Sequence, residues 1–309
     1  MNNLTVEDFA NSFGTTLNSF SNELKTLISN TDFKYEVYEG EVRDQLLLRV
    51  LKAIANDRQI IGAEERKKVW YNGWAENLNS FIQKESNLET LIPKFIRNNQ
   101  PIRYNGQYIR PQNSKFELDF ITVFRTWLFQ NYFSQYDNIY EFGCGTGFNL
   151  VLLDKLLPGK SLHGLDFVQS SVDLINLIAE KNNINLKGYL FDMVTPDENV
   201  QIAQNSAVFT FGAIEQLAGK FKNFLHFLLE RKPKLCVHIE PTVELYNEDN
   251  LIDYLSIQFH KKRGYTKGLL PYLQELETIQ RIKLIKVKRL NFGNLFMEGY
   301  MLYIWKPVE

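Results

Sequence analysis

The stretch IYEFGCGTG, residues 139–147, decides the fold class of this chain. A short apolar run leads into three glycines at alternate positions, Gly143, Gly145 and Gly147. Glycine allows a tight turn and a close approach of ligand to backbone, and a helix that starts here offers free N–H groups. The third glycine comes one residue earlier than in the GxGxxG pattern of nicotinamide dinucleotide sites, which disfavours an NAD enzyme. We therefore expect a buried strand, a ligand-binding turn and a helix start.

Short apolar segments alternate with helical segments on the C-terminal side of this turn. The expected strands are 138–143, 161–166, 187–192, 206–211 and 234–240. The expected helices are 147–157, 169–182, 216–231, 248–262 and 268–277. Two long final runs, 279–290 and 296–305, predict an antiparallel pair at the sheet edge, joined by residues 291–294. This alternation is typical of a mostly parallel sheet with helices on both faces, so we expect a doubly wound α/β domain over 135–309.

Acidic residues stand at the ends of the second and third predicted strands. An acid in the place of Asp166 accepts hydrogen bonds from ribose hydroxyls in dinucleotide enzymes. Asp192 and Met193 would bracket an adenine ring, because the carboxylate accepts from the exocyclic amine and the thioether packs on the ring. The alternative for both acids is the capping of a following turn.

Taken together, the strand ends over residues 138–305 resemble the class I S-adenosylmethionine-dependent methyltransferase family. That family has E/D-x-G-x-G-x-G after the first strand, an acid after the second, and an acid with an apolar or small neighbour after the third. Many members carry E-H-L after the fourth strand, and residues 212–217, GAIEQL, match this with Gln216 in place of histidine. The resemblance implies a seven-stranded Rossmann-like sheet with strand order 3-2-1-4-5-7-6.

The resemblance also implies S-adenosyl-L-methionine as cofactor and S-adenosyl-L-homocysteine as product. It puts Glu141 and Gly143 near the methionine amino end, and Phe211 and Gly212 beneath the sulfonium. The expected cofactor-binding residues are Glu141, Gly143, Cys144, Gly145, Gly147, Asp166, Phe167, Asp192, Met193, Phe211, Gly212 and Arg110. The alternative for Cys144 is a small residue that merely fits the loop.

His238 and Glu240 are the candidate catalytic residues. They lie two positions apart on the fifth predicted strand, so their side chains share one face. Glu240 ends that strand, where open α/β sheets bind ligands, and we expect it to act as a base or a substrate anchor with His238 behind it. The alternative is a buried polar pair that ties the strand to a helix.

A basic turn after the fifth strand is a candidate for binding the acceptor. The run Lys261–Arg263 is followed by Tyr265, and three adjacent cations suit a phosphate or a carboxylate. Arg263 and Tyr265 are therefore expected substrate-binding residues, unless the run is only a solvated helix end. Gln216 is a third expected substrate contact, with a helix start as the alternative.

The segment 102–110, IRYNGQYIR, predicts a β-hairpin with a type I′ turn at Asn105-Gly106. The expected pairing places Arg103 opposite Tyr108 and Ile102 opposite Ile109. Residues that precede the first strand often fold over the cofactor in this family. We therefore expect Arg110 at the methionine carboxylate and Tyr108 over the sulfonium or the substrate, with an ordinary surface hairpin as the alternative.

The rest of residues 1–134 predicts a mostly helical N-terminal cap. Apolar residues at spacings of four and three predict a first amphipathic helix, namely Phe9, Phe13, Leu17, Phe20, Leu24 and Leu27. Further helices are expected at 40–56, 64–83, 88–97 and 115–133. Trp70, Tyr71 and Trp74 would line the acceptor side or belong to the core of the third helix.

Composition limits the location and the partners of the chain. The 309 residues carry a net charge of -1 and two cysteines, and the first residues have neither a basic nor an apolar leader segment. We therefore expect a cytoplasmic protein without disulfides, membrane segments or a metal ion. Overall neutrality makes nucleic acid an unlikely partner and favours a small polar acceptor, such as the hydroxyl of a sugar or nucleotide-sugar.

Other functions stay open at this point. A methyltransferase that acts on a protein or RNA would keep the same motifs. A catalytically silent scaffold of the same fold would also keep the sheet, although the intact glycine loop and both acids argue against it. The aromatic N-terminal helices would serve equally as a homodimer interface.

Overall fold

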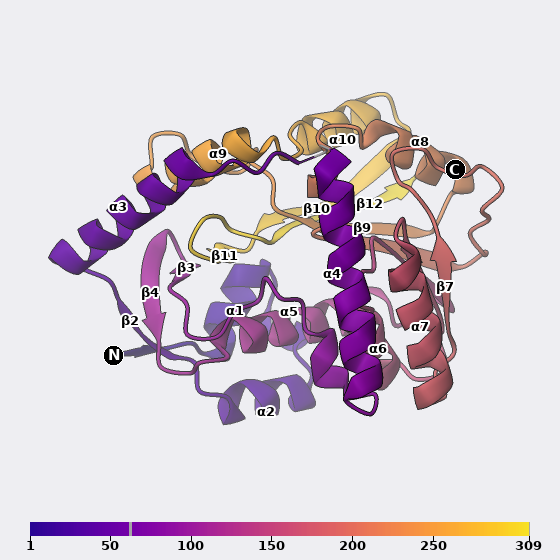
Figure 1. Cartoon of the computed structure of the whole chain (residues 1–309), viewed down its shortest axis with the longest axis horizontal. Helices are drawn as coiled ribbons and strands as arrows, with labels where there is room; N and C mark the ends of the chain where they lie inside the picture. The colour runs from indigo at the N-terminus through magenta and orange to yellow at the C-terminus, as the bar shows by residue number, and fades with distance from the viewer. Residues whose placement is uncertain (62–63, 309) are drawn as a thin grey trace.

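A seven-stranded sheet forms the centre of the protein in the computed structural model, which describes residues 1–61 and 64–308 (Figure 1). Its strands are β5 (Asn138–Phe142), β6 (Ser161–Asp166), β7 (Leu186–Leu190), β8 (Ser206–Phe211), β9 (Leu235–Glu240), β10 (Ile282–Arg289) and β12 (Met301–Pro307). Their order across the sheet is β10-β12-β9-β8-β5-β6-β7. β5 to β9 run parallel, whereas β12 and β10 pair antiparallel. The predicted α/β fold with a seven-stranded, mostly parallel sheet is confirmed.

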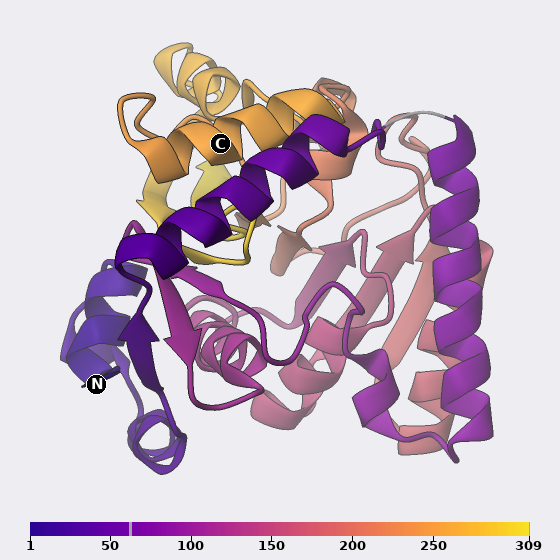
Figure 2. The same cartoon turned by 60° about the vertical axis from the view of Figure 1, so that its left-hand side comes forward.

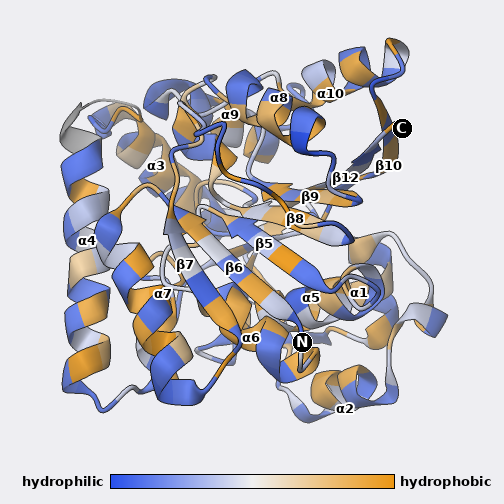
Figure 3. Ribbon diagram, turned by 90° about the vertical axis from the view of Figure 1, so that its right-hand side faces the viewer, coloured by the Kyte–Doolittle hydropathy of each residue, from blue (hydrophilic) through white to orange (hydrophobic). Residues whose placement is uncertain are grey.

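Helices cover both faces of this sheet (Figures 1 and 3). One layer contains α5 (Phe116–Tyr132), α6 (Phe148–Leu156) and α7 (Gln169–Asn182), and the other contains α8 (Lys222–Arg231) and α10 (Leu269–Thr278). Successive residues of β5 belong to different cores, since Ile139 packs in the first layer and Tyr140 in the second. Both faces of the strands are buried, which explains their nearly continuous apolar sequences.

The N-terminal region contains most of the expected helices, and the first of them needs correction. The single helix predicted through Phe9 and Leu27 is wrong, because the chain forms α1 (Val6–Phe13) and α2 (Asn22–Asn30) instead. Gly14 ends α1 in a left-handed conformation with φ of 63°, which glycine adopts without strain. Thr5 and Asp8 form the capping box at the start of α1.

The other helices complete the chain. They are α3 (Gly40–Asn56), α4 (Glu64–Gln83) and α9 (Leu251–Arg263), with the short 3₁₀ helices η1 (Leu17–Ser19), η2 (Leu88–Leu91) and η3 (Ile214–Leu217). The longer helix predicted at 88–97 is thus limited to η2. Among the helices of residues 1–61 and 64–308, none combines the length and the apolar composition needed to cross a membrane. Figure 2 shows α4 standing along one side of the molecule, where it packs against α7.

A second sheet of five strands joins the N-terminal region to the C-terminal half. Its order is β1 (Asn2–Asn3), β2 (Lys34–Val37), β4 (Gln107–Pro111), β3 (Ile102–Tyr104) and β11 (Phe292–Gly293). The predicted hairpin is confirmed, with Arg103 opposite Tyr108 and Ile102 opposite Ile109. The expectation of a mostly helical region did not include the other three strands.

The connection between β10 and β12 is longer than expected because it contributes to this second sheet. Residues 291–294 are not a simple joining turn, since Phe292 pairs with Tyr104 and Gly293 with Arg103. A Cβ on Gly293 would lie 2.3 Å from the carbonyl oxygen of Met297, so the close fold-back of this connection requires glycine.

Aromatic packing holds the two sheets together. The ring of Phe120 on α5 stacks on that of Phe292, with centroids 3.6 Å apart and planes at 3°. The same ring contacts Phe9 and Phe13 of α1 and Tyr104 of β3. Phe120 is therefore a junction between the helical layer, the second sheet and the C-terminal connection.

We expect Phe120→Ala to lower the free energy of unfolding by about 3–5 kcal/mol, because the cavity would separate three elements that pack on one ring. Chemical denaturation of both proteins measures this difference. Leu48→Ala is the control, because Leu48 is half exposed and its loss should change stability by no more than about 0.5 kcal/mol. Equal stability of Phe120→Ala and wild type would show that the sheets are joined elsewhere.

Candidate functional site

A two-lobed cavity lies at the carboxyl ends of the central parallel strands, where open α/β sheets bind ligands. Its larger lobe measures about 280 Å³, near the lower end of the roughly 300–1,000 Å³ found for small-molecule sites. Residues from the ends of β6, β7 and β8 line it, including Asp166, Phe167, Asp192, Met193 and Gln216. The smaller lobe measures about 60 Å³. It is lined by the glycine turn with Glu141, Cys144, Gly145, Asn149 and Phe211.

Four residues line both lobes and therefore mark their junction. They are Gly143, Gly212, Trp70 and Trp74. The two glycines belong to the turns after β5 and β8, whereas the two tryptophans come from α4. The junction of the two lobes is thus lined by two backbone turns and by a pair of indole rings.

The turns after β5 and β8 touch each other so closely that one of them requires glycine. A Cβ on Gly143 would lie 2.4 Å from the Cβ of Ala213, and the φ of Gly143 is 73°. Gly147 also has a φ of 73°, and a Cβ there would lie 2.5 Å from Ile175. Any larger side chain at either position would strain the backbone and clash, which explains the spacing of the glycine motif.

Asp166 holds the glycine turn from beneath. The N–H of Gly145 donates to Oδ2 at 2.9 Å, and the N–H of Val168 donates to Oδ1 at 3.0 Å. Burial raises the pKa of Asp166 to about 6, although these backbone donors act in the opposite direction. A carboxylate has about four acceptor sites, so Asp166 keeps acceptor capacity toward the lobe that it lines.

Glu141 presents an unpartnered buried oxygen at the smaller lobe. The amide of Asn149 donates to Oε1 at 2.6 Å, whereas Oε2 has no hydrogen-bond partner. Burial raises the pKa of Glu141 to about 8 and outweighs the opposite effects of Asn149 and Arg125. Such an orphaned acceptor in a cavity wall fits a ligand that brings a donor or a positive charge.

Asp192, Met193 and Phe167 lie where the sequence predicted, at the wall of the larger lobe. Asp192 also caps its own turn, because it accepts from the N–H of Val194 at 2.8 Å and from the hydroxyl of Thr195 at 3.3 Å. Its carboxylate therefore caps the turn, which is the alternative that the sequence left open, and it also lines the lobe. Their roles toward a ligand stay predictions.

Glu240 and His238 share one face of β9 as expected, but neither reaches the cavity. Both side chains are fully buried. The carboxylate of Glu240 accepts from the N–H groups of Ala213 and Glu215, each at 3.2 Å, so it holds the turn after β8. His238 contacts the hydroxyl of Thr210 at 3.0 Å, and burial lowers the pKa of His238 to about 3. This geometry matches the alternative of a buried polar pair rather than a base at the substrate.

Four other candidates lie away from the cavity. The hydroxyl of Tyr108 is buried between Arg103 and the carbonyl of Leu295. Arg110 stacks on Tyr38 at the exposed face of the second sheet. Arg263 donates to Asp57 and to the hydroxyl of Tyr265, and Tyr265 itself is buried. None of these four residues lines either lobe of the cavity, because their side chains pair with partners elsewhere in the fold, and their roles toward a ligand stay predictions.

The tryptophans of α4 are the functional candidates that the sequence left undecided. Trp70 and Trp74 lie one helical turn apart with ring centroids 5.2 Å apart. Only the packing of α4 over the strand ends shows that this face meets the cavity, since the same spacing also suits an ordinary helix core. Tyr71 between them is exposed and belongs to the outer face.

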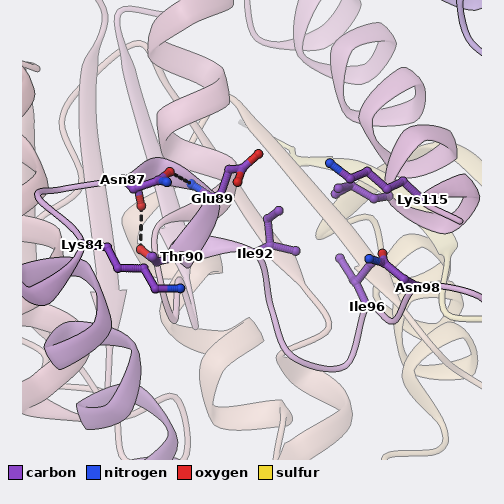
Figure 4. Close-up of a pocket in the computed structure, with 9 residues that line it drawn as sticks. Lys84, Asn87, Glu89, Thr90, Ile92, Ile96, Asn98 and Lys115 are labelled. Atoms are coloured by element: carbon purple, nitrogen blue, oxygen red, sulfur yellow. Dashed lines mark hydrogen bonds between the residues drawn. The ribbon is translucent and has the colours of Figure 1, made fainter.

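Another hollow lies near η2, lined in part by Lys84, Asn87, Thr90 and Lys115 (Figure 4). Its polar groups satisfy one another, since the hydroxyl of Thr90 donates to the carbonyl of Asn87 at 2.7 Å. None of the described residues that line it has a buried polar atom without a partner. Nor do the described residues contain a cluster of histidine, cysteine and acids placed to hold a metal ion. The strand-end cavity is therefore the candidate site.

No family model matches the chain. O-methyltransferase 3 of Dictyostelium discoideum is 26% identical over 127 residues, which cover 41% of this chain and 28% of that protein. The chain thus matches less than a third of the length of that relative.

Solved structures are similar at lower identity. PigF with SAH matches with a TM-score of 0.47 and 14% identity, over 86% of this chain and 71% of that one. The Streptomyces coelicolor A3(2) geranyl diphosphate C-methyltransferase complex has a TM-score of 0.46 and 11% identity, over 75% and 98%. An rRNA methylase from Escherichia coli has a TM-score of 0.45 and 11% identity, over 86% and 92%. The glycine turn and the mostly parallel seven-stranded sheet of this chain agree with the architecture that the sequence resemblance implied.

The position of Glu240 predicts a structural effect of its substitution. Glu240→Gln keeps one acceptor oxygen and turns an amide N–H₂ toward a backbone donor, so we expect a loss of about 1–3 kcal/mol in unfolding free energy. Denaturant titration measures it, with the same change at exposed Glu248 as the control. Unchanged stability of Glu240→Gln would mean that the turn after β8 is held by other contacts.

Proposed function

We propose that this chain is an S-adenosylmethionine-dependent methyltransferase that acts on a small molecule. One observation carries the proposal: a cavity at the strand ends has two acids in its larger lobe and an orphaned buried carboxylate oxygen in its smaller one. The cofactor has the matching form, with hydroxyls and an amine at its adenosine end and an ammonium at its methionine end.

The residues present fit the cofactor by their chemistry. Asp166 would accept from the ribose hydroxyls, and Asp192 with Met193 would hold the adenine. Glu141 would bind the methionine ammonium through Oε2, which has no partner of its own. Gly143 and Gly145 line the smaller lobe where the methionine end would lie, and a Cβ at either position would meet Ala213 or Trp74 within 3 Å.

When bound, the cofactor would supply a methyl group on a sulfonium: an acceptor would bond in line to the methyl carbon as the carbon–sulfur bond breaks and S-adenosylhomocysteine leaves. The contribution of this chain would be alignment, since backbone turns and indole rings line the cavity in which the cofactor would be held. Gln216, which lines the larger lobe, would orient an acceptor. Catalysis would not depend on His238 or Glu240, because both are buried beneath the turn after β8.

The modest size of the cavity, with lobes of about 280 and 60 Å³, supports a small acceptor. The further expectation of a sugar or nucleotide-sugar rested on Glu240 and on the basic turn with Arg263 and Tyr265, and none of these lines the described cavity. The proposal therefore concerns a small molecule without a preference for hydroxyl over amine.

Calorimetric titration with S-adenosylhomocysteine, followed by transfer of a labelled methyl group to pooled fractions, tests this function. We expect micromolar binding and label in the metabolite pool. Gly143→Ala should lose binding, because the new Cβ clashes with Ala213. Gly159→Ala is the matched control, since Gly159 also has a positive φ of 84° but nothing within 4 Å of a Cβ.

Each other outcome has a definite meaning. Label in the protein or RNA fraction would overturn the small acceptor and keep the cofactor. Absence of binding by folded wild-type protein would overturn the methyltransferase itself and favour a catalytically silent scaffold. Equal binding by Gly143→Ala and Gly159→Ala would place the ligand away from the glycine turn.

Cofactor affinity should depend on pH through Glu141. The free protein holds the pKa of Glu141 at about 8, between the charges of Arg125 and Asp166, so the carboxyl is mostly protonated near pH 7. A cationic ligand favours the ionised form and releases the proton on binding. Affinity for S-adenosylmethionine should therefore rise by up to about tenfold per pH unit below pH 8 and level off above it. Titrations from pH 6.5 to 8.5 measure this, and a profile that stays steep in Glu141→Gln would exclude Glu141 as its source.

A further inference from the structure

The junction of the two lobes is lined by aromatic rings on the one hand and by glycine backbone on the other. Trp70 and Trp74 present their indole rings there, opposite the bare backbone of Gly143 and Gly212. The smaller lobe adds the rings of Phe148 and Phe211 and the unpartnered oxygen of Glu141. Among the described residues that line this smaller lobe there is no lysine, arginine or histidine.

In the smaller lobe, aromatic faces stand beside a carboxylate, a combination that suits a positive charge. The nearby cations are Lys67 and Lys220 in the larger lobe, and Arg125, whose Cζ lies 3.7 Å from the ring centroid of Phe148. The face of an aromatic ring carries negative potential, tryptophan most strongly, and attracts cations within about 6 Å. The attraction is larger where water is partly excluded, and Trp70, Trp74, Gly143 and Gly212 are all half-buried. A neutral group at the same place would gain only apolar contact.

The connectivity of the cofactor identifies the group that meets this junction, given the proposed function. Its sulfonium links the adenosine part to the methionine part. Asp166 and Asp192 mark the adenosine lobe, and Glu141 marks the methionine lobe. The sulfonium must therefore lie between the lobes, where the only side chains that line both belong to Trp70 and Trp74 among the described residues.

We propose that Trp70 and Trp74 are cofactor-binding residues that recognise the positive charge of the sulfonium. They thereby distinguish the methyl donor from its neutral thioether product. This inference rests on the proposed function and assigns to the N-terminal helix α4 the discrimination between S-adenosylmethionine and S-adenosylhomocysteine. The consequence is weak product inhibition, because loss of the methyl group also removes the charge that the indoles attract.

The position of Trp74 in the ligand-free protein allows its role in cofactor binding to be observed by fluorescence. Its indole packs directly on Gly145, since a Cβ on Gly145 would lie 2.9 Å from Cζ2 and 3.0 Å from Cη2 of Trp74. A ligand in the smaller lobe must displace this ring. The other two tryptophans, Trp127 and Trp305, are almost completely buried in the core, so a change in tryptophan fluorescence on binding would report on α4.

Affinities for three ligands test the inference by calorimetry at pH 7.5. These are S-adenosylmethionine, S-adenosylhomocysteine and sinefungin, an analogue that carries an amine in place of the methylsulfonium. We expect wild type to bind both cations about 3- to 30-fold more tightly than the neutral product. Trp74→Leu should bring this ratio close to one, and Trp74→Phe, which keeps an aromatic face, should retain part of it. Tyr71→Leu on the outer face of α4 is the matched control and should leave the ratio unchanged.

The result that overturns the inference differs from the result that overturns the function. If wild type binds all three ligands with equal affinity, the tryptophans do not recognise charge, although the methyltransferase proposal stands. If Trp74→Leu lowers every affinity by the same factor, the indole is only an apolar wall. If wild type binds none of the three, the proposed function itself has failed. An unchanged unfolding midpoint of Trp74→Leu and Trp74→Phe shows that the ratios come from folded protein.

Discussion

The contact between the turns after β5 and β8 is the constraint on which the candidate site depends. Gly143 meets Ala213 at a distance that admits no side chain, and buried carboxylates fix both turns from below. Asp166 accepts from the N–H of Gly145, and Glu240 accepts from the N–H groups of Ala213 and Glu215. Burial raises the pKa of each carboxyl, so part of the stability of the fold is given up to shape these turns. The cavity is what remains between the turns and α4.

The main sheet was predictable because its signals are local. Each central strand is a short apolar run bounded by a turn or a helix, and the Asn105-Gly106 turn identified its hairpin directly. The second sheet was not, because its remaining strands are only two to four residues long and pair with distant segments. Gly293 in particular resembles part of a turn, and only its pairing with Arg103 makes it a strand. Pairing over such distances leaves no periodicity in the sequence.

The residues of the candidate site also differ in how far the sequence predicted their positions. Glu141, Asp166 and Asp192 follow directly from strand ends, and the structure brings all three to one cavity. Tyr108 and Arg263 had suitable chemistry, but their direction depends on partners elsewhere in the fold. Strand geometry predicted that Glu240 and His238 share one face of β9. It did not show that this face lies beneath the turn after β8 and not at the cavity. The sequence did not show what the Trp74 face of α4 packs against, and the structure shows that this face lines the cavity.

The pairing of β11 with β3 has a consequence for folding while the protein is being synthesised. β3 lies within the first third of the chain, yet its outer edge stays open until β11 has been made. At about 5–20 residues per second, the ribosome needs on the order of 10–40 seconds to travel from Tyr104 to Phe292. During that time an unpaired strand edge and the ring of Phe120 would be accessible to chaperones or to neighbouring chains. The second sheet thus waits for a strand that is made long after its neighbour β3.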